Sequence, residues 1–455
     1  MNNIAGMIVQ KKLKIALWGA GKNCHTYLEV IEKFCLIEMI VDINPLLEGT
    51  CVGRYLCQSP DMLKNIDVVV VTIDDKNAKS GIYDFCSEKG LEVCNYRDLL
   101  AVIYPVYEES FIKTVLHDAD PEEKVIMKKY IGIDVPAYGC NLNCSYCYVG
   151  KKCSRETAFP ELIHSPRYIR YRLRKEKIGG AALIGICANG ETLFADKFVD
   201  ICTELLKEGH YLMIVTNGTA VKVIKDIIKN AGEYVEHVIF KISFHYLELK
   251  KKGLSERFAD NVNIINESEA SYTLELMPHD ELIEFIPEVL SFSLKNFGAY
   301  PQLTVGRDER NNRELLTKLS KEEYIRTWKV FQSEMFDLKM KFYMLHGTNC
   351  NAGRDSFFID LYSGVMKRCL FPENMGDFYD DSISLDFERV GDSCPLNYCF
   401  NCHAYLTMGV MPDILAPTYL NIRDRVREDG THWIKEKMRG FLNTRFYEEY
   451  IDVRT

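Results

Sequence analysis

Two series of apolar segments alternate with amphipathic, helix-like segments along the 455-residue chain. The first series begins with a strand-length apolar run at residues 13–18, and similar runs follow at residues 37–42, 66–73 and 91–96. Short apolar strands that alternate with helices favour a parallel sheet with helices on both faces. We therefore predict a doubly wound α/β domain over roughly residues 10–105.

The second series predicts six further strands, each of which is followed by a loop or a helix. These strands are expected at residues 129–136, 181–190, 211–218, 237–246, 271–278 and 301–307, with helices at 195–209 and 220–232 among them. Six β/α units over about 180 residues are typical of an open, partial barrel, in which the chemistry lies at the C-terminal ends of the strands.

The remaining segments read mainly as helices. Residues 106–127 are charged and predict a helical connector, and residues 322–342 predict one long helix. Residues 165–177 carry six basic side chains, which indicates a solvated helix face or a contact with an acidic ligand. The tail over residues 418–455 is expected to be mainly helical.

A glycine turn follows the first predicted strand at Gly19-Ala20-Gly21, and Asp42 ends the next strand. Such glycines let the backbone approach a phosphate at a helix N-terminus, and the acid stands where a ribose hydroxyl would bind. The third glycine of that fingerprint is replaced by Cys24. Nucleotide binding through Gly19, Gly21 and Asp42 and a fold without a ligand both remain open.

Composition narrows the class of protein. Hydrophobic residues make up 47% and charged residues 27% of the chain, which is typical of a globular protein. The net charge of -9 argues against a nucleic-acid partner. The absence of a signal-peptide pattern and of a long apolar run predicts a cytoplasmic protein with no membrane span. Seventeen cysteines in a reducing compartment favour metal ligation over disulfides.

Three of these cysteines, Cys140, Cys144 and Cys147, directly follow an apolar strand pattern. Thiolates at positions i, i+4 and i+7 of a loop can reach three irons of one 4Fe–4S cubane. No fourth cysteine lies at a comparable short spacing, so one iron would stay open for chemistry. A zinc site that a distant His or Cys completes is the alternative.

A CxxxCxxC motif at the end of a first barrel strand, with an aromatic residue before its third cysteine, resembles the radical S-adenosylmethionine (radical SAM) superfamily. The resemblance covers about residues 128–310. It implies that the open iron binds S-adenosylmethionine, whose reductive cleavage yields a 5′-deoxyadenosyl radical that abstracts a substrate hydrogen. It also implies oxygen sensitivity and an electron donor such as flavodoxin or ferredoxin.

The resemblance maps the cofactor-binding positions of the family onto Tyr146, Gly190, Glu191, Asn217 and Ser243. Tyr146 would pack near the adenine, and Gly190 and Glu191 would receive the amino group. Asn217 lies in a Thr-Asn-Gly sequence at the third strand end, and Ser243 would meet the ribose and carboxylate. Asn189 and Thr192 depart from the Gly-Gly-Glu-Pro sequence of the family.

A second group of cysteines comprises Cys350, Cys369, Cys394, Cys399 and Cys402. The spacing Cys350-x13-Gly364-x4-Cys369, with a predicted hairpin around Gly364, resembles the SPASM/Twitch extensions of radical enzymes. This resemblance implies one auxiliary 4Fe–4S cluster. Cys350, Cys369, Cys399 and Cys402 are the preferred ligands, with Cys394 as the competitor, and a structural zinc site is the alternative.

Several other side chains lie close to the predicted strand ends. Cys187 shares a strand face with Asn189 and is a candidate catalytic residue that returns a hydrogen atom to a substrate radical; a packed small residue is the alternative. Cys153 is a similar candidate. His245, Tyr246, Glu275 and Arg307 could face the substrate, whereas His403 reads as a local structural residue.

The resulting division comprises a Rossmann-like domain (1–120), a radical SAM partial barrel (121–340), a SPASM/Twitch-like iron–sulfur domain (341–410) and a helical tail (411–455). The first of these resembles domains of sugar-modifying and surface-glycan proteins. We therefore expect a substrate that is a sugar, nucleotide sugar or glycan precursor, modified by epimerisation, dehydrogenation or deoxygenation. A SPASM-type peptide maturase is an alternative, although no winged-helix leader-binding domain is evident. A zinc-bearing nucleotide-binding scaffold is another.

Overall fold

The computed structural model describes residues 3–147, 159–308, 314–369, 373–399 and 401–446. Cysteine 153, a candidate from the sequence, lies outside these residues. The chain forms two compact units. The first comprises Met1–Leu116 together with Glu161–Tyr168, and the second comprises His117–Pro160 together with Ile169–Thr455. The finer division of the second unit into barrel, extension and tail stays a prediction.

The first unit is built on a six-stranded sheet with the order β3-β4-β2-β1-β5-β6. Its elements are α1 (Asn3–Lys11), β1 (Lys14–Trp18), α2 (Lys22–Phe34), β2 (Leu36–Val41), β3 (Cys51–Val52), β4 (Tyr55–Gln58), β5 (Val68–Val71), α3 (Lys76–Glu88), β6 (Glu92–Asn95) and α4 (Tyr96–Ile112). All neighbouring strands are parallel except β3 and β4. The strand order reverses between β1 and β5, as in a doubly wound fold.

Residues 161–168 complete the first unit, although they follow the cysteine loop in the sequence. Ile163 is buried in the apolar core of that unit. The His164 Nδ1 atom lies 2.5 Å from Glu108 Oε1, and the Ser165 backbone N–H donates to Glu108 Oε2 over 2.9 Å. Glu108 is itself fully buried, so this segment satisfies a charge within the unit.

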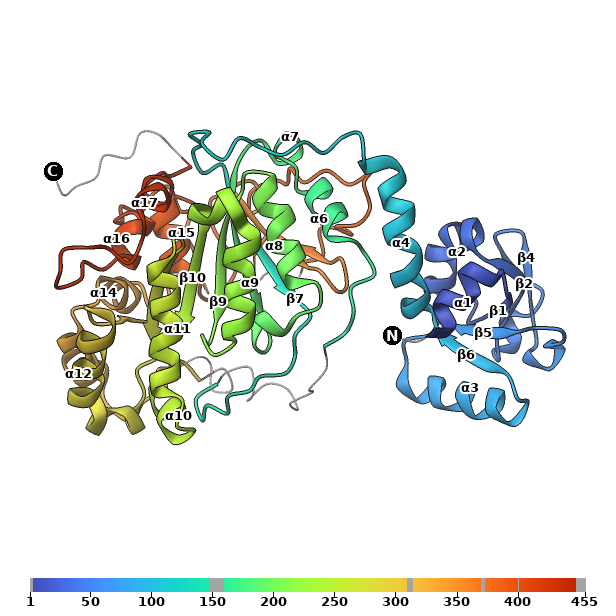
Figure 1. The fold of residues 1–455 in the computed structure, drawn as a ribbon, viewed down its shortest axis with the longest axis horizontal. Helices are drawn as coiled ribbons and strands as arrows, with labels where there is room; N and C mark the ends of the chain where they lie inside the picture. The colour runs from blue at the N-terminus through green and yellow to red at the C-terminus, as the bar shows by residue number, and fades with distance from the viewer. Residues whose placement is uncertain (1–2, 148–158, 309–313, 370–372, 400, 447–455) are drawn as a thin grey trace. The chain divides into compact units, whose positions relative to one another are not determined.

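The second unit is built on an eight-stranded sheet with the order β12-β11-β10-β9-β8-β7-β13-β14 (Figure 1). Its strands are β7 (Lys129–Val135), β8 (Ala182–Ala188), β9 (Tyr211–Thr216), β10 (Val238–Ser243), β11 (Ser271–Leu276), β12 (Gln302–Leu303), β13 (Ser356–Asp360) and β14 (Met366–Lys367). Strands β7 to β12 are parallel, which confirms the predicted barrel strands. Strand β13 extends the sheet in parallel beside β7, and β13 and β14 form the predicted hairpin.

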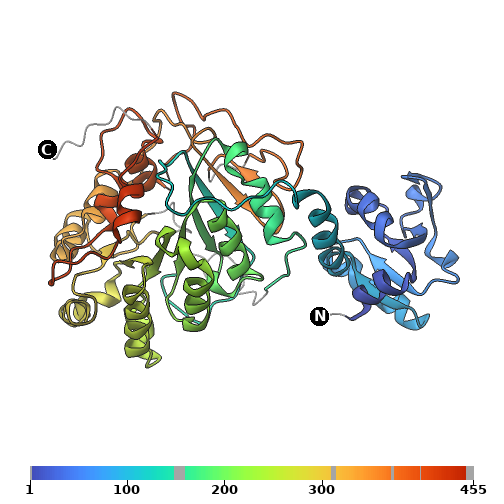
Figure 2. The same ribbon diagram turned by 45° about the horizontal axis from the view of Figure 1, so that its top comes forward.

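Helices α8, α9 and α11 cover the outer face of the barrel strands (Figures 1 and 2). The helices that include residues of this unit are α6 (Pro166–Arg172), α7 (Lys175–Ile178), α8 (Phe198–Lys207), α9 (Val221–Ala231), α10 (Tyr246–Lys251), α11 (Ser255–Glu267), α12 (Ile286–Phe297), α13 (Lys321–Trp328), α14 (Glu334–Lys341), α15 (Cys402–Met408), α16 (Tyr419–Arg423) and α17 (Glu436–Leu442). In the described residues, no helix has the length and apolarity needed to cross a membrane.

The inner face of the barrel is apolar away from the C-terminal strand ends. Side chains from the C-terminal part of the chain pack against it. Met213 of β9 and Ile239 of β10 are register partners, and together with Tyr130 of β7 they belong to one core with Tyr405 and Tyr419. Tyr419 lies on α16, and its hydroxyl is 3.1 Å from the Met213 sulfur. The C-terminal helices therefore close the barrel interior below the strand ends.

Three helical predictions differ from the structure. The helix expected over 322–342 is broken, because Gln332 takes a left-handed conformation (φ 51°) and Ser333 caps α14. The Ser333 hydroxyl also accepts a bond from the Leu303 backbone N–H, which ties the break to β12. The described part of the tail contains only α16 and α17, with irregular chain between them, and the connector helix ends at Ile112.

The basic segment at 165–177 is not a simple solvated helix face. Arg170 and Arg172 are buried, and each forms ion pairs within the second unit. Arg170 binds Glu208 over 2.9 Å, and Arg172 binds Asp381 over 2.7 Å. These two side chains therefore stabilise the fold.

Candidate active site

The loop with the CxxxCxxC motif leaves the C-terminal end of β7, where the sequence placed it. Cys140 is exposed, Cys147 is half-buried and Cys144 is buried. Burial is the main cause of a raised pKa at Cys140 and Cys144, to about 12 for Cys144, and the charge of Cys147 raises both further. The three thiols are therefore neighbours, and metal binding must displace their protons.

Three different elements hold this loop through hydrogen bonds. Asn217, at the end of β9, donates from Nδ2 to Asn141 Oδ1 over 2.8 Å and lies 3.6 Å from the Cys140 sulfur. The backbone N–H of Asn143 donates to Glu248 of α10 over 2.9 Å. The Ser145 hydroxyl donates to Glu281 over 3.0 Å. Such outer contacts orient metal ligands, and bonds to sulfur tune the potential of a cluster.

Tyr146 is buried against two imidazole rings that the sequence did not pair with it. Its hydroxyl lies 2.9 Å from His245 Nδ1, and its ring centroid is 4.2 Å from that of His279. Burial lowers the pKa of His245 to about 4, so this ring is neutral near pH 7. The three rings form an aromatic surface beside the cysteine loop; contact with an adenine stays a prediction.

Gly190 and Glu191 join the end of β8 to both neighbouring strand ends. A Cβ atom at Gly190 would lie 2.2 Å from the Gly139 carbonyl oxygen, so only glycine fits beside the cysteine loop. The Glu191 carboxylate accepts bonds from the Thr216 hydroxyl (2.5 Å) and the Asn217 backbone N–H (2.9 Å). Both carboxylate oxygens therefore bind the chain itself, and a contact between Glu191 and the cofactor amino group stays a prediction.

Cys187 and Asp134 face the barrel interior side by side. They are register partners on β8 and β7, and the Cys187 thiol donates to Asp134 Oδ1 over 2.9 Å. Burial and the charge of Asp134 raise the pKa of Cys187 well above its ordinary value. The thiol is thus protonated, the form that a hydrogen-atom donor requires. Ser243 and Glu275 are register partners on the neighbouring strands β10 and β11.

The sequence analysis missed three cationic side chains, which lie on β10, α14 and α16. Lys241 Nζ lies 3.3 Å from Glu275 Oε1, and Arg423 of α16 contacts the same carboxylate. Lys339 of α14 donates to the Thr304 hydroxyl over 2.6 Å. Lys241 could have been identified from the sequence, since a lysine interrupts an otherwise apolar strand. Lys339 and Arg423 could not, because only the tertiary fold brings their helices to the barrel.

Two other candidates from the sequence occupy different surroundings. The Tyr246 hydroxyl donates to Glu288 of α12 over 2.5 Å, and its ring packs against Phe244 and Phe292, away from Cys187. His403 contacts one of these cations, because its Nε2 atom lies 3.0 Å from Arg423 Nη2. The sequence analysis had assigned His403 a local structural role only.

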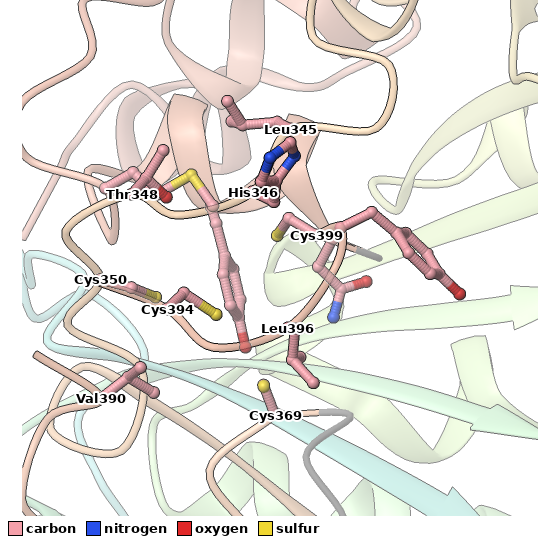
Figure 3. Close-up of a pocket in the computed structure, with 13 residues that line it drawn as sticks. Leu345, His346, Thr348, Cys350, Cys369, Val390, Cys394, Leu396 and Cys399 are labelled. Carbon is pink, nitrogen blue, oxygen red and sulfur yellow. The ribbon is translucent and has the colours of Figure 1, made fainter.

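The second group of cysteines lines one apolar pocket (Figure 3). Cys350, Cys369, Cys394 and Cys399 surround it together with side chains such as Leu345, Leu396 and Tyr405. Cys402 does not line this pocket, and its sulfur lies 3.8 Å from the Phe342 carbonyl oxygen. The structure therefore groups Cys394, rather than the preferred Cys402, with the other three thiols.

Backbone hydrogen bonds hold two of the four cysteines that line this pocket. The backbone N–H groups of Cys394 and Cys399 donate to the carbonyls of Thr348 and Leu345 over 3.0 and 2.7 Å. Gly364 takes a left-handed conformation (φ 74°) in the hairpin turn that leads to Cys369. Four thiols around one apolar pocket fit a 4Fe–4S cluster with every iron bound by the protein.

In a 4Fe–4S cubane each cysteine thiolate binds a different iron, whereas the ligands of a single-ion site all surround one metal ion. In the part of the chain that the structure describes, no three His, Cys, Asp or Glu side chains are placed to hold one metal ion. The loop at 140–147, with three neighbouring thiols and hydrogen bonds from outside, fits the ligand set of a cluster with one open iron.

The glycine turn of the first unit brings Gly19 and Asp42 together. The Asp42 carboxylate accepts bonds from the backbone N–H groups of Ala20 and Asn44 over 2.8 and 2.9 Å. A Cβ atom at Gly19 would lie 2.6 Å from Ile73, so packing alone explains that glycine. A Cβ at Gly21, the N-cap residue of α2, would meet no atom within 4 Å. Nucleotide binding at this turn stays a prediction.

Comparison with known proteins identifies the family of the barrel. The model of the Radical SAM superfamily matches residues 135–288. No curated protein matches the chain. Similar solved structures include SuiB of Streptococcus suis bound to the precursor peptide SuiA (14% identity, TM-score 0.41, 66% of this chain and 82% of that chain). Another is anSMEcpe with bound AdoMet (15% identity, TM-score 0.41, 56% and 80%).

The matched residues contain the cysteine loop, the ends of β8, β9 and β10, and the aromatic surface around Tyr146. This family uses a 4Fe–4S cluster together with S-adenosylmethionine. Residues 135–288 therefore form a radical SAM domain.

Proposed function

We propose that Cys140, Cys144 and Cys147 hold the 4Fe–4S cluster and that S-adenosylmethionine binds at its open iron. When bound, this pair supplies a 5′-deoxyadenosyl radical that removes a hydrogen atom from a substrate carbon. The observation that carries the proposal is the position of the cysteine loop at the C-terminal end of β7, held by bonds from β9, α10 and Glu281. The substrate then lies above the inner face of the barrel.

The surrounding residues position the loop and the cofactor. Asn217 holds Asn141 and donates toward the Cys140 sulfur, and Glu191 holds Asn217 in turn. Tyr146 offers its ring to the adenine, and Ser243 lies at a strand end where it can reach the ribose. Glu191 is thus a positioning residue.

We also propose that Cys350, Cys369, Cys394 and Cys399 hold an auxiliary 4Fe–4S cluster. With four protein thiolates, that cluster would have no open iron for the substrate. Its role is then electron transfer, and an external donor such as flavodoxin or ferredoxin supplies the electrons.

Cys187 is the proposed hydrogen-atom donor. The substrate carbon radical takes the hydrogen from the Cys187 sulfur and leaves a thiyl radical. Return of the thiol then needs one electron from the external donor and one proton. Asp134 accepts the thiol hydrogen bond, so its carboxylate lies beside the sulfur that takes up that proton. A hydrogen-atom donor of this kind is what an epimerisation requires.

The proposed substrate is a sugar, nucleotide sugar or glycan precursor. The parallel sheet of the first unit, with a glycine turn after β1, supports this choice because such turns suit nucleotide phosphates. The peptide-maturase and zinc-scaffold alternatives stay predictions. A zinc scaffold would purify with zinc and no iron.

Anaerobic reconstitution tests the core proposal. The reconstituted protein should form 5′-deoxyadenosine from S-adenosylmethionine when dithionite is present, measured by mass spectrometry. Replacement of Cys140, Cys144 and Cys147 by Ala should abolish that product. Cys51→Ala is the matched control, since Cys51 is an exposed cysteine of the first unit. Normal product formation by the triple variant would refute the proposal.

A further inference from the structure

Two exposed aromatic rings lie beside the cysteine loop, and the proposed mechanism gives neither of them a role. Phe159 keeps 45% and Phe194 keeps 36% of its accessible surface, and their ring centroids are 6.1 Å apart. A Cβ atom at Gly139 would lie 2.5 Å from the Phe159 ring, so this ring rests on the backbone directly before Cys140. Exposed aromatic side chains that gather at one place are typical of protein interaction sites.

The N-terminus of α9 lies at the same place. One cavity is lined by Phe194, by Asn141 of the cysteine loop, and by Thr219 and Ala220, which directly precede α9. The Asn141 Nδ2 group donates to the Thr219 hydroxyl over 2.8 Å. The N-cap residue is Ala220, whose side chain has no acceptor for the first N–H groups of the helix. The positive partial charge of this helix end therefore lies beside the loop.

Helix α9 carries a row of lysines on its exposed side. Lys222, Lys225 and Lys229 follow one another at intervals of three and four residues, so they share one face of the helix. All three are exposed, and in the described part of the chain no hydrogen bond or ion pair engages their side chains. The same helix has one carboxylate, Asp226. The row is therefore a basic surface on a protein whose net charge is -9.

We propose that the two phenylalanines and the lysine row of α9 form the docking surface for an acidic protein that delivers single electrons to the cluster. The lysines and the helix N-terminus attract negative charge and orient the partner, and the aromatic pair supplies an apolar contact beside Cys140. One electron passes from the reduced cofactor of the partner to the cluster, and no bond forms or breaks in that step. This inference rests on the proposed function, which it deepens by giving the external electron donor a place to bind.

The rate of 5′-deoxyadenosine formation by the reconstituted holoenzyme, driven by reduced flavodoxin at several concentrations, tests the inference. At low ionic strength, Lys222→Glu/Lys225→Glu should lower kcat/KM for flavodoxin about tenfold or more and leave kcat nearly unchanged, because the reversed charges slow association. The loss should shrink to about twofold at about 0.5 M salt, where the charges are screened. Lys222→Gln/Lys225→Gln should give a smaller loss than the charge reversal.

Two controls separate docking from damage to the cluster. Lys11→Glu/Lys64→Glu changes the net charge by the same amount, and both lysines are exposed residues of the first unit, so kcat/KM for flavodoxin should stay within about twofold of wild type. Dithionite, which needs no docking surface, should support equal rates of product formation in all variants.

Equal kcat/KM for flavodoxin in the wild type and in Lys222→Glu/Lys225→Glu at low salt would overturn the docking surface. A wild-type rate that does not depend on salt would overturn it as well, without the use of any variant. Product formation with dithionite, but with neither reduced flavodoxin nor reduced ferredoxin, would overturn the choice of an acidic carrier. No product with dithionite would instead contradict the proposed function, which the other outcomes leave intact.

Discussion

Glu191 connects three strand ends through hydrogen bonds that no single local motif predicts. It is 2% exposed and accepts bonds from Thr216 and Asn217, while its own backbone N–H donates to Gly139. A buried carboxylate that accepts several bonds is costly to remove, because its donors lose their partners. Its influence on the cysteine loop passes through Asn217.

Replacing Glu191 by Ala should therefore destabilise the site even when no cofactor is bound. Each donor left unsatisfied costs about 1–3 kcal/mol, and Asn217 is free to turn away from Asn141. We expect the reconstituted variant to lose most 5′-deoxyadenosine formation and to shift the redox potential of its cluster. Glu191→Gln, which keeps one acceptor, should retain more of both. The exposed Glu267→Ala is the control, and a normal potential in Glu191→Ala would contradict the positioning role.

The cysteines of the second group permit a direct choice between ligand sets. Cys394→Ala should remove the auxiliary cluster, so that iron falls from about eight to about four atoms per chain. Cys402→Ala should keep nearly all the iron, since Cys402 lies outside the pocket. Iron analysis with Mössbauer spectroscopy measures both. Iron loss in Cys402→Ala with full iron in Cys394→Ala would restore the set that the spacing favoured.

At the residue scale, spacing predicted the first cysteine loop because all three thiols lie within eight residues. It favoured Cys402 over Cys394, whereas the structure places Cys394 in the pocket. Both neighbour Cys399 in the sequence, and the choice depends on backbone bonds to Leu345 and Thr348 from a distant segment. Lys339 was missed for the same reason.

At the scale of elements, the end of β8 must pass close to the cysteine loop. A Cβ atom added at Gly190 would lie 2.2 Å from the Gly139 carbonyl oxygen. This contact involves backbone, which cannot rotate away as a side chain can. The glycine thus sets the spacing between two neighbouring loops of the site.

Gly190→Ala should force the two loops apart and destabilise the barrel by about 1–3 kcal/mol, the usual cost of overpacking. We expect a lower apparent melting temperature and reduced iron after reconstitution. Gly81→Ala is the control, because a Cβ there meets no atom within 4 Å and alanine favours the α3 helix. Unchanged melting and iron content in Gly190→Ala would show that the loops have room.

The barrel strands were predictable because most of them are apolar runs with few polar interruptions. The break between α13 and α14 was not. The periodicity continues through Gln332 and Ser333, and the interruption is stabilised by bonds from Ser333 to β12, which are tertiary contacts. The parallel addition of β13 beside β7 was also missed, since a hairpin pattern does not reveal its sheet neighbours.

At the scale of the whole molecule, buried neutral histidines make stability depend on pH. The Nδ1 atom of His210 accepts from the Ala182 backbone N–H, and its Nε2 atom faces the Leu173 carbonyl oxygen at 2.8 Å. Burial lowers its pKa from 6.5 to about 4. His237 shows a similar shift to about 4.

Since the folded pKa of His210 is depressed, its stabilising contribution is complete above pH 6.5 and is lost as pH falls toward 4. The loss amounts to at most about 3 kcal/mol at about 1.4 kcal/mol per pKa unit. Anaerobic melting at pH 7.5 and 5.0 should show a drop in wild type and a smaller drop in His210→Gln. The exposed His25→Gln is the control, and an equal drop in all three would refute the assignment.

The first unit takes eight of its residues, Glu161–Tyr168, from the middle of the chain, and His164 and Ser165 among them contact the buried Glu108. Residues 1–116 alone therefore do not contain the whole unit. A truncation after residue 116 would leave a carboxylate without partners, and a gene fusion would have to carry the stretch beyond the cysteine loop as well.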